Sequence, residues 1–145
     1  SKKDMIHFQK TTSDKYPEGD TNIVIMGRNT WIDPNMRVPL PNRINVLATN
    51  KEHNIYKNAD FCIKGDLIKA VKKIHIEYPD KIKWIIGGPE VVKQLFNLIQ
   101  EFYITRIYGN FLCDTYLDIS KIENEMKFIK KIEADSTCHF EIWKK

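Results

Sequence analysis

From the start of the chain to Phe96, short apolar runs alternate with segments of helical periodicity, which predicts an α/β domain. The apolar runs are nearly free of polar residues, as is typical of parallel strands buried on both faces. The predicted strands are Asn22–Met26, Ile44–Thr49, Ala59–Ile63 and Trp84–Ile86. The predicted helices are Asp4–Thr12, a short one within Gly27–Trp31, Asp66–Tyr78 and Pro89–Phe96. In the third helix, the residues expected to face the sheet are Leu67, Ile68, Val71 and Ile74.

After Phe96 the pattern changes to alternation of aromatic and β-branched residues with polar ones. This pattern predicts antiparallel strands at Phe102–Tyr108, Phe128–Ile132 and His139–Trp143. We expect these strands to close one side of the sheet. The prediction is therefore a single α/β domain over residues 1–145, with a mostly parallel mixed central sheet flanked by helices.

Two of the predicted parallel strands end in glycine turns that open helices. Met26 is followed by Gly27 and Arg28, and Ile86 is followed by Gly87-Gly88-Pro89. Ligands of α/β sheets bind beyond the carboxyl ends of the strands, so two such turns predict a long anionic ligand that crosses both. No glycine pattern of the Rossmann or Walker type is present.

Two basic residues stand near these strand ends. Arg28 is suited to a phosphate because its guanidinium is planar and always charged, and Lys51 adds a second cation after the predicted strand Ile44–Thr49. The competing interpretation is that both are ordinary solvated surface charges.

Asp4 is a carboxylate on an otherwise apolar helical face, beside Met5 and Phe8. Desolvation there would raise its pKa and suit proton transfer. The alternative is a carboxylate stabilised by the helix dipole near the N-terminus. His7 is expected at the surface. The remaining histidines show no metal-ligand spacing, so no metal site is predicted.

Composition narrows the functional classes. The net charge of +4 suits an anionic small molecule and is too small to indicate nucleic acid. The three cysteines are far apart and odd in number, which favours reduced thiols in a cytoplasmic compartment. No apolar run reaches membrane-spanning length, and the first residues lack the layout of a signal peptide.

Taken together, the motifs resemble the dihydrofolate reductase family, in its order and near its spacings, over essentially the whole chain. The matching segments are D-M-I-H-F-Q-K-T-T, I-V-I-M-G-R-N-T-W, P-L-P-N-R-I-N-V-L, W-I-I-G-G-P-E-V-V, F-Y-I-T-R-I and C-D-T-Y. The resemblance implies NADPH-dependent reduction of dihydrofolate to tetrahydrofolate, a step of one-carbon metabolism and nucleotide biosynthesis. It also implies binding of antifolate-type small molecules, and it leaves open a fused or partner thymidylate synthase.

The resemblance assigns roles residue by residue. Asp4 would support protonation of the substrate at N5, and Thr105 would hydrogen-bond that carboxylate. Substrate-binding positions would be Met5, Phe8, Leu40, Arg43 and Ile86, with Arg43 binding the glutamate α-carboxylate. Cofactor-binding positions would be Gly27, Arg28, Asn29, Thr30, Thr49, Asn50, Lys51, Gly87, Gly88, Glu90 and Val91. Asp114 matches an aspartate that supports the mobile loop of some members.

The resemblance also predicts that the Gly87–Gly88 peptide bond is cis. Paired glycines minimise the steric part of the cost of a cis bond because neither has a Cβ.

The chain departs from the family pattern at four places, which include a Pro34–Val38 loop about two residues longer than usual and Tyr116-Leu117-Asp118 in place of the usual aromatic-proline ending. The family begins with a core strand and a mobile loop that have no counterpart before Ser1. Because an empty slot in a sheet leaves backbone groups unpaired, we expect a missing piece of sequence rather than a protein without that strand. Val92 stands where the family usually has tyrosine beside the nicotinamide. The alternatives are a related reductase of the riboflavin pathway or a non-catalytic binding domain of the same fold.

Overall fold

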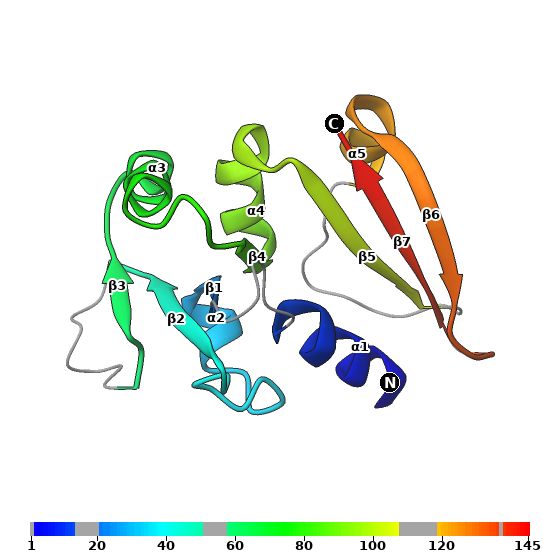
Figure 1. Ribbon diagram of the computed structural model, residues 1–145, viewed down its shortest axis with the longest axis horizontal. Coiled ribbons are helices and arrows are strands. Elements are labelled where there is room, and N and C mark those ends of the chain that lie inside the picture. The colour runs from blue at the N-terminus through cyan, green and yellow to red at the C-terminus, as the bar shows by residue number, and fades with distance from the viewer. Residues whose placement is uncertain (1, 14–20, 51–57, 108–118, 137) are drawn as a thin grey trace. The chain divides into compact units, whose positions relative to one another are not determined.

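The computed structural model describes residues 2–13, 21–50, 58–107, 119–136 and 138–145 (Figure 1). The chain divides into two compact units, one formed by Ser1–Gln9 with Leu98–Lys145 and the other by Lys10–Asn97. Helix α1 (Lys2–Ser13) runs across the division between Gln9 and Lys10. No helix in the described part of the chain is long and apolar enough to cross a membrane.

The unit Lys10–Asn97 contains a parallel four-stranded sheet with the order β3-β2-β1-β4. Its strands are β1 (Asn22–Gly27), β2 (Arg43–Ala48), β3 (Phe61–Ile63) and β4 (Lys83–Gly87). The central strand β1 is buried throughout, and Val24, Ile25 and Met26 are 0% exposed. This burial on both faces explains why the strands read as continuous apolar runs. The predicted α/β class with a parallel sheet is confirmed.

Three helices follow the strands of this unit: α2 (Arg28–Trp31), α3 (Leu67–Glu77) and α4 (Pro89–Leu95), the last continued by a 3₁₀ turn, η2 (Phe96–Leu98). Asp66 caps α3, because its side-chain oxygen accepts a hydrogen bond from the Lys69 backbone N at 3.2 Å. Leu67 and Val71 are buried as predicted. The prediction for Ile68 was wrong, since this residue is 40% exposed and lies about 100° around the helix from buried Leu67.

The other unit contains a three-stranded antiparallel sheet in the order β5-β7-β6. The strands are β5 (Glu101–Ile107), β6 (Lys127–Glu133) and β7 (Cys138–Lys144), and helix α5 (Ile119–Glu125) precedes β6. All three strands were predicted, although α5 was not. They pair with one another as a separate sheet, and no ladder joins β4 to β5 in the described residues. The predicted antiparallel strands are confirmed, whereas the expectation that they close one side of the parallel sheet stays a prediction.

The core of this second unit lies on both faces of the antiparallel sheet. Its buried apolar residues are Phe102, Ile104, Ile122, Met126, Cys138 and Phe140. His7 of α1 stacks on Phe140, with ring centroids 3.8 Å apart and an interplanar angle of 9°. The expectation that His7 is a surface residue was therefore wrong, because its imidazole supplies a flat partner for a core aromatic ring.

Candidate functional site

The two glycine turns lie next to each other at the carboxyl edge of the parallel sheet. Met26 aligns with Gly87 in the ladder between β1 and β4. A Cβ on Gly27 would lie 2.9 Å from Cγ2 of Val91 and 3.8 Å from the carbonyl oxygen of Gly87. A Cβ on Gly87 would lie 3.6 Å from Oγ1 of Thr30. The backbone of each turn is therefore within side-chain contact distance of the other turn.

The second turn has the backbone that the sequence predicted. The Gly87–Gly88 peptide bond is cis, which confirms the prediction. Gly87 has φ +142°, a region that residues with a Cβ rarely adopt. Glycine is therefore required at Gly87 by conformation and at Gly27 by the close approach of Val91.

Helix α4 continues directly from this turn. Pro89 occupies its first turn, and the Val92 backbone N donates to the Gly88 carbonyl oxygen at 3.1 Å. Val91 and Val92 are both 8% exposed, whereas Glu90 is exposed. Ile86, the last residue before the glycines, is half-buried.

A third strand end completes this edge of the sheet. The Thr49 backbone N donates to the Ile63 carbonyl oxygen at 3.0 Å, and Oδ1 of Asn50 accepts from the Gly65 backbone N at 3.2 Å. These bonds tie the end of β2 to the residues that leave β3. Arg28 and Asn29 are exposed at the start of α2. Lys51, predicted as a neighbouring cation, lies outside the described residues, as does Asp114.

Arg43 begins β2 and is a buried cation, 5% exposed. Its Nη1 donates to Oγ1 of Thr12 at 2.7 Å, and its Nε donates to the Pro41 carbonyl oxygen at 3.0 Å. Burial lowers the pKa of the Arg43 guanidinium, but arginine stays charged at any working pH. Two directional bonds therefore fix the orientation of a buried positive charge, which is an arrangement suited to a carboxylate partner.

Asn45 holds the turn that leads to Arg43. Its Oδ1 accepts from the Leu40 backbone N at 2.8 Å, and its Nδ2 donates to the carbonyl oxygens of Leu40 and Arg43 at 2.9 and 3.0 Å. Asn45 is 1% exposed and Leu40 is 2% exposed. Leu40 is therefore a buried residue within the proline-rich segment that leads into β2.

Thr12 and Asn45 are the residues that the sequence reasoning missed. The backbone carbonyl of Thr12 also accepts from Nδ2 of Asn22 at 2.9 Å, so this threonine links α1, β1 and β2. A signal for Asn45 was present: it is the only polar side chain within the apolar run Ile44–Ala48. A buried asparagine normally needs hydrogen-bond partners, so its position indicated a structural network.

The predicted acid lies in the other unit. Asp4 and Met5 belong to the first turns of α1, but their side chains lie outside what the structure describes. Phe8, one turn further on, is half-buried. Thr105 is half-buried in β5, opposite Phe140 of β7. The expected hydrogen bond between Thr105 and Asp4 therefore remains a prediction.

A second polar cluster lies on the antiparallel sheet and was not predicted. Glu141 accepts from His139 Nε2 at 2.6 Å, from Trp143 Nε1 at 2.9 Å and from Arg106 Nε at 3.2 Å. Burial by itself would raise the pKa of Glu141. The hydrogen bonds from His139 and Trp143, with the charge and hydrogen bond of Arg106, outweigh burial and hold that pKa below its usual value.

Comparison with known proteins adds family information to this geometry. A family model described as dihydrofolate reductase matches residues 2–144. The dihydrofolate reductase of Sus scrofa is 32% identical over 123 residues, which cover 79% of this chain and 66% of the pig protein. A putative dihydrofolate reductase of Caenorhabditis elegans is 34% identical over 131 residues, covering 84% of this chain and 69% of the relative.

A more distant relative is covered more completely. The dihydrofolate reductase of Heliothis virescens is 28% identical over 156 aligned positions, which cover 99% of this chain and 84% of the moth protein. The chain thus spans about two thirds of the length of the pig and nematode relatives and more of the moth protein.

Proposed function

The chain belongs to the dihydrofolate reductase family, and on that premise we propose that it reduces dihydrofolate to tetrahydrofolate. The observation that carries the proposal is the contact between the turns at Gly27 and Gly87–Gly88, at the strand ends where α/β sheets bind ligands. When bound, NADPH would supply the hydride that is added at C6 of the substrate. The chain's own residues would bind and orient the cofactor and the substrate and would support protonation of the substrate.

The glycine turns fit a dinucleotide phosphate. Because Gly87 and Gly88 have no side chains, their backbone is not covered by Cβ atoms where a pyrophosphate would approach. We assign the pyrophosphate to the amides of Gly87, Gly88, Glu90 and Val91, and the remaining cofactor contacts to Gly27, Asn29 and Thr30. Arg28 pairs with the 2′-phosphate, and Thr49, Asn50 and Lys51 contact the adenosine side.

The substrate contacts follow from the buried arginine. Arg43 binds the α-carboxylate of the folate glutamate, and its bond to Thr12 holds the guanidinium in position for that contact. Leu40, Phe8, Met5 and Ile86 provide apolar contacts for the rings of the substrate. Asn45 contributes indirectly, since it fixes the backbone between Leu40 and Arg43.

The reaction adds a hydride at C6 and a proton at N5. In our proposal Asp4 binds the pterin ring and orders the water that delivers the proton to N5, while Thr105 hydrogen-bonds the Asp4 carboxylate. Phe8, one turn further along α1, would pack on the pterin ring. Antifolate-type molecules bind the same residues. We also propose that the chain acts in the cytoplasm, and we leave open whether a thymidylate synthase is its partner.

The test is an assay of the purified chain with NADPH and dihydrofolate. We expect one tetrahydrofolate, measured by chromatography, for each NADPH oxidised, measured by absorbance. NADPH oxidation that does not depend on dihydrofolate would contradict the proposal. Two other results identify the alternatives: reduction of a ribosylated pyrimidine indicates a reductase of the riboflavin-pathway type, and tight folate binding without turnover indicates a non-catalytic binding domain.

A further inference from the structure

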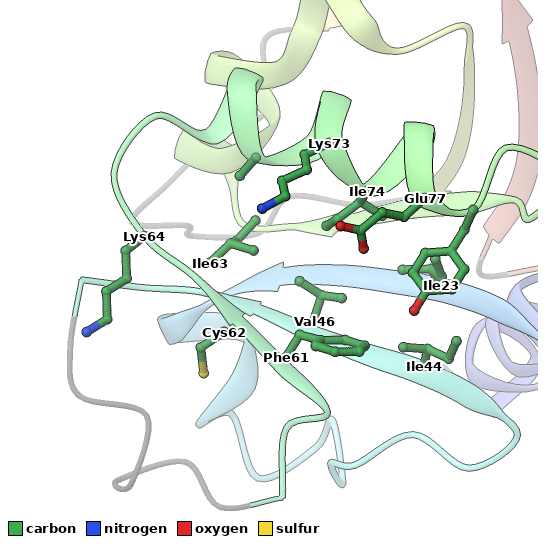
Figure 2. A pocket seen from close by; sticks show the side chains of 12 residues that line it. Ile23, Ile44, Val46, Phe61, Cys62, Ile63, Lys64, Lys73, Ile74 and Glu77 are labelled. Atoms are coloured by element: carbon green, nitrogen blue, oxygen red, sulfur yellow. The ribbon is translucent and has the colours of Figure 1, made fainter.

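A cavity of about 310 Å³ lies between α3 and the sheet, within the unit Lys10–Asn97 (Figure 2). We call it the α3 pocket and define it by Ile23, Ile44, Val46 and Phe61 on the strands and by Ala70, Lys73, Ile74 and Glu77 on the helix. Its volume is at the lower end of the range of small-molecule sites, roughly 300–1,000 Å³.

The strand side of the α3 pocket is apolar and includes an accessible ring. Ile23 pairs with Ile44 in the β1–β2 ladder, and Val46 pairs with Phe61 in the β2–β3 ladder, so these side chains share one sheet face. Ile23 and Val46 are 1% exposed, but Phe61 is 48% exposed. The pocket therefore has a buried aliphatic floor and an aromatic ring at its mouth, which suits a flat apolar ligand.

The helix side leaves this space open. Ala70 faces the pocket with only a methyl group, and Ile74, one turn on, is half-buried. Figure 2 shows Lys73, Ile74 and Glu77 projecting from α3 toward the strands. A helix that packed fully on this face would carry larger apolar residues at these positions.

The charges at the pocket favour an anion. Lys73 and Glu77 are four residues apart on α3, yet neither forms an ion pair with any residue that the structure describes. Lys64, which follows β3, also lines the pocket. Two cations and one carboxylate leave an excess of positive charge beside the apolar floor.

The apolar floor of the α3 pocket lies away from the glycine turns of the site proposed above, although its lining residues Ile63 and Lys64 adjoin Gly65, the hydrogen-bond partner of Asn50. Ile23, Ile44 and Phe61 stand at the amino-terminal starts of β1, β2 and β3, whereas the glycine turns stand at the carboxyl ends of β1 and β4. We propose that the α3 pocket binds a small aromatic carboxylate. The ring packs against Phe61 and Ile44, and the carboxylate pairs with Lys73. This proposal does not depend on the proposed reductase activity.

The test is a titration with naphthoate, followed by NMR of the isoleucine methyl groups. We expect saturable shifts at Ile23, Ile44 and Ile74. Naphthylmethylamine, which has the same ring and a positive charge, is expected to bind more weakly. Equal or tighter binding of the amine, or shifts confined to isoleucines outside the pocket, would overturn the proposal.

Two variants locate the ligand. Lys73→Ala should weaken naphthoate binding about tenfold, as expected for loss of one charge-assisted contact, whereas Lys72→Ala on the outer side of α3 should not. Ala70→Leu should fill the cavity and remove binding without lowering the melting temperature. Naphthoate binding that is unchanged in Lys73→Ala would contradict the proposal, and that variant keeps the test decisive should Ala70→Leu fail to fold.

Discussion

Nη1 of Arg43 and Oγ1 of Thr12 are 2.7 Å apart, so a hydroxyl from the last turn of α1 orients a buried cation at the start of β2. Arg43 is 5% exposed and Thr12 is 4% exposed. A hydrogen bond to a charged group at this depth restricts the guanidinium to one orientation. The contact therefore links helix α1 to the residue that we propose binds the glutamate tail of folate.

Thr12→Val is expected to raise KM for dihydrofolate several-fold with a smaller effect on kcat. The substitution removes the acceptor of the Arg43 bond, and the affected donor is buried, so folding should lose about 1–3 kcal/mol. Pteridines without the glutamate tail should react as before. Thr11→Val, at the adjacent half-buried position, is the matched control. Steady-state kinetics in which both variants behave alike would show that Thr12 has no positioning role.

Asp4→Asn is expected to remove nearly all turnover while changing NADPH affinity by a few-fold at most. Asparagine keeps the shape of the side chain but cannot hold the charge or relay a proton to N5. The measurements are kcat for dihydrofolate and the dissociation constant of NADPH. Glu125→Gln removes one exposed carboxylate of α5 and serves as the control. Retention of most of the kcat near neutral pH would leave Asp4 as a helix-end carboxylate only.

Arg28→Ala is expected to weaken NADPH by about 1.5–3 kcal/mol and to leave NADH nearly unchanged. The guanidinium would pair with the 2′-phosphate, which only NADPH carries. Titration of both cofactors into the wild-type chain and the variant gives the comparison. Lys93→Ala, which removes an exposed cation from α4, is the control. Equal affinities of the wild-type chain for NADPH and NADH would contradict the assignment of Arg28.

The three turn glycines are expected to tolerate alanine to different degrees. Gly27→Ala would place its Cβ 2.9 Å from Cγ2 of buried Val91, so the Val91 side chain or its backbone must shift, at a cost of about 1–3 kcal/mol. Gly87→Ala would be strained at φ +142°. Gly88→Ala meets only Oγ1 of Thr30 at 3.7 Å and should cost less stability than either. Chemical denaturation ranks the three variants, and a most severe effect at Gly88 would refute this order.

Glu141→Gln is expected to destabilise the chain at neutral pH by about 1–3 kcal/mol, because it weakens the bonds from His139, Trp143 and Arg106. The pKa of Glu141 is lowered in the folded state, so its contribution is complete above the unfolded value of about 4.3. The contribution is lost as pH falls through the folded pKa. The difference in unfolding free energy between wild type and variant should therefore shrink below about pH 4.

Charges facing Glu141 from other elements set the size of this effect. Arg106 of β5 also binds Glu123 of α5, with Nη2 and Oε1 at 3.2 Å, and Lys131 of β6 is the ladder partner of Glu141. Glu125→Gln, which changes an exposed carboxylate in the same way, is the control. A stability difference that stays constant from neutral to acidic pH would contradict the role of ionised Glu141.

The parallel unit could be predicted closely because its signals are local. Continuous apolar runs mark strands buried on both faces, and the glycine pair at Gly87–Gly88 marks a turn that needs unusual backbone. The family resemblance added the cis peptide bond, which the structure confirms. In contrast, α5 was missed because it has only seven residues, with one buried apolar position at Ile122. A period of 3.6 cannot be recognised from one residue.

Contacts between distant residues were the least predictable feature. The Arg43–Thr12 bond joins residues 31 positions apart, and the stacked pair His7–Phe140 joins the two ends of the chain. Secondary-structure propensity and hydrophobic periodicity depend only on residues that are close together in the sequence. Neither of these two contacts could therefore be predicted from them. Asn45 differs, since a polar residue inside an apolar strand did indicate a buried network, although not its partners.

Helix α1 carries Asp4 in its first turns and Thr12 in its last, and in our proposal these two residues act at opposite ends of the ligand. Eight residues at 1.5 Å each correspond to about 12 Å along the helix axis between the residue that we propose relays the proton and the residue that orients Arg43. This length is fixed by backbone hydrogen bonds rather than by side-chain packing. One alanine inserted between Phe8 and Thr11 would lengthen the helix by about 1.5 Å and would rotate Thr12 by roughly 100° about the helix axis relative to Asp4. If our assignment of Asp4 and Arg43 is right, such a chain would still bind a pterin or a glutamate separately but would bind folate more weakly.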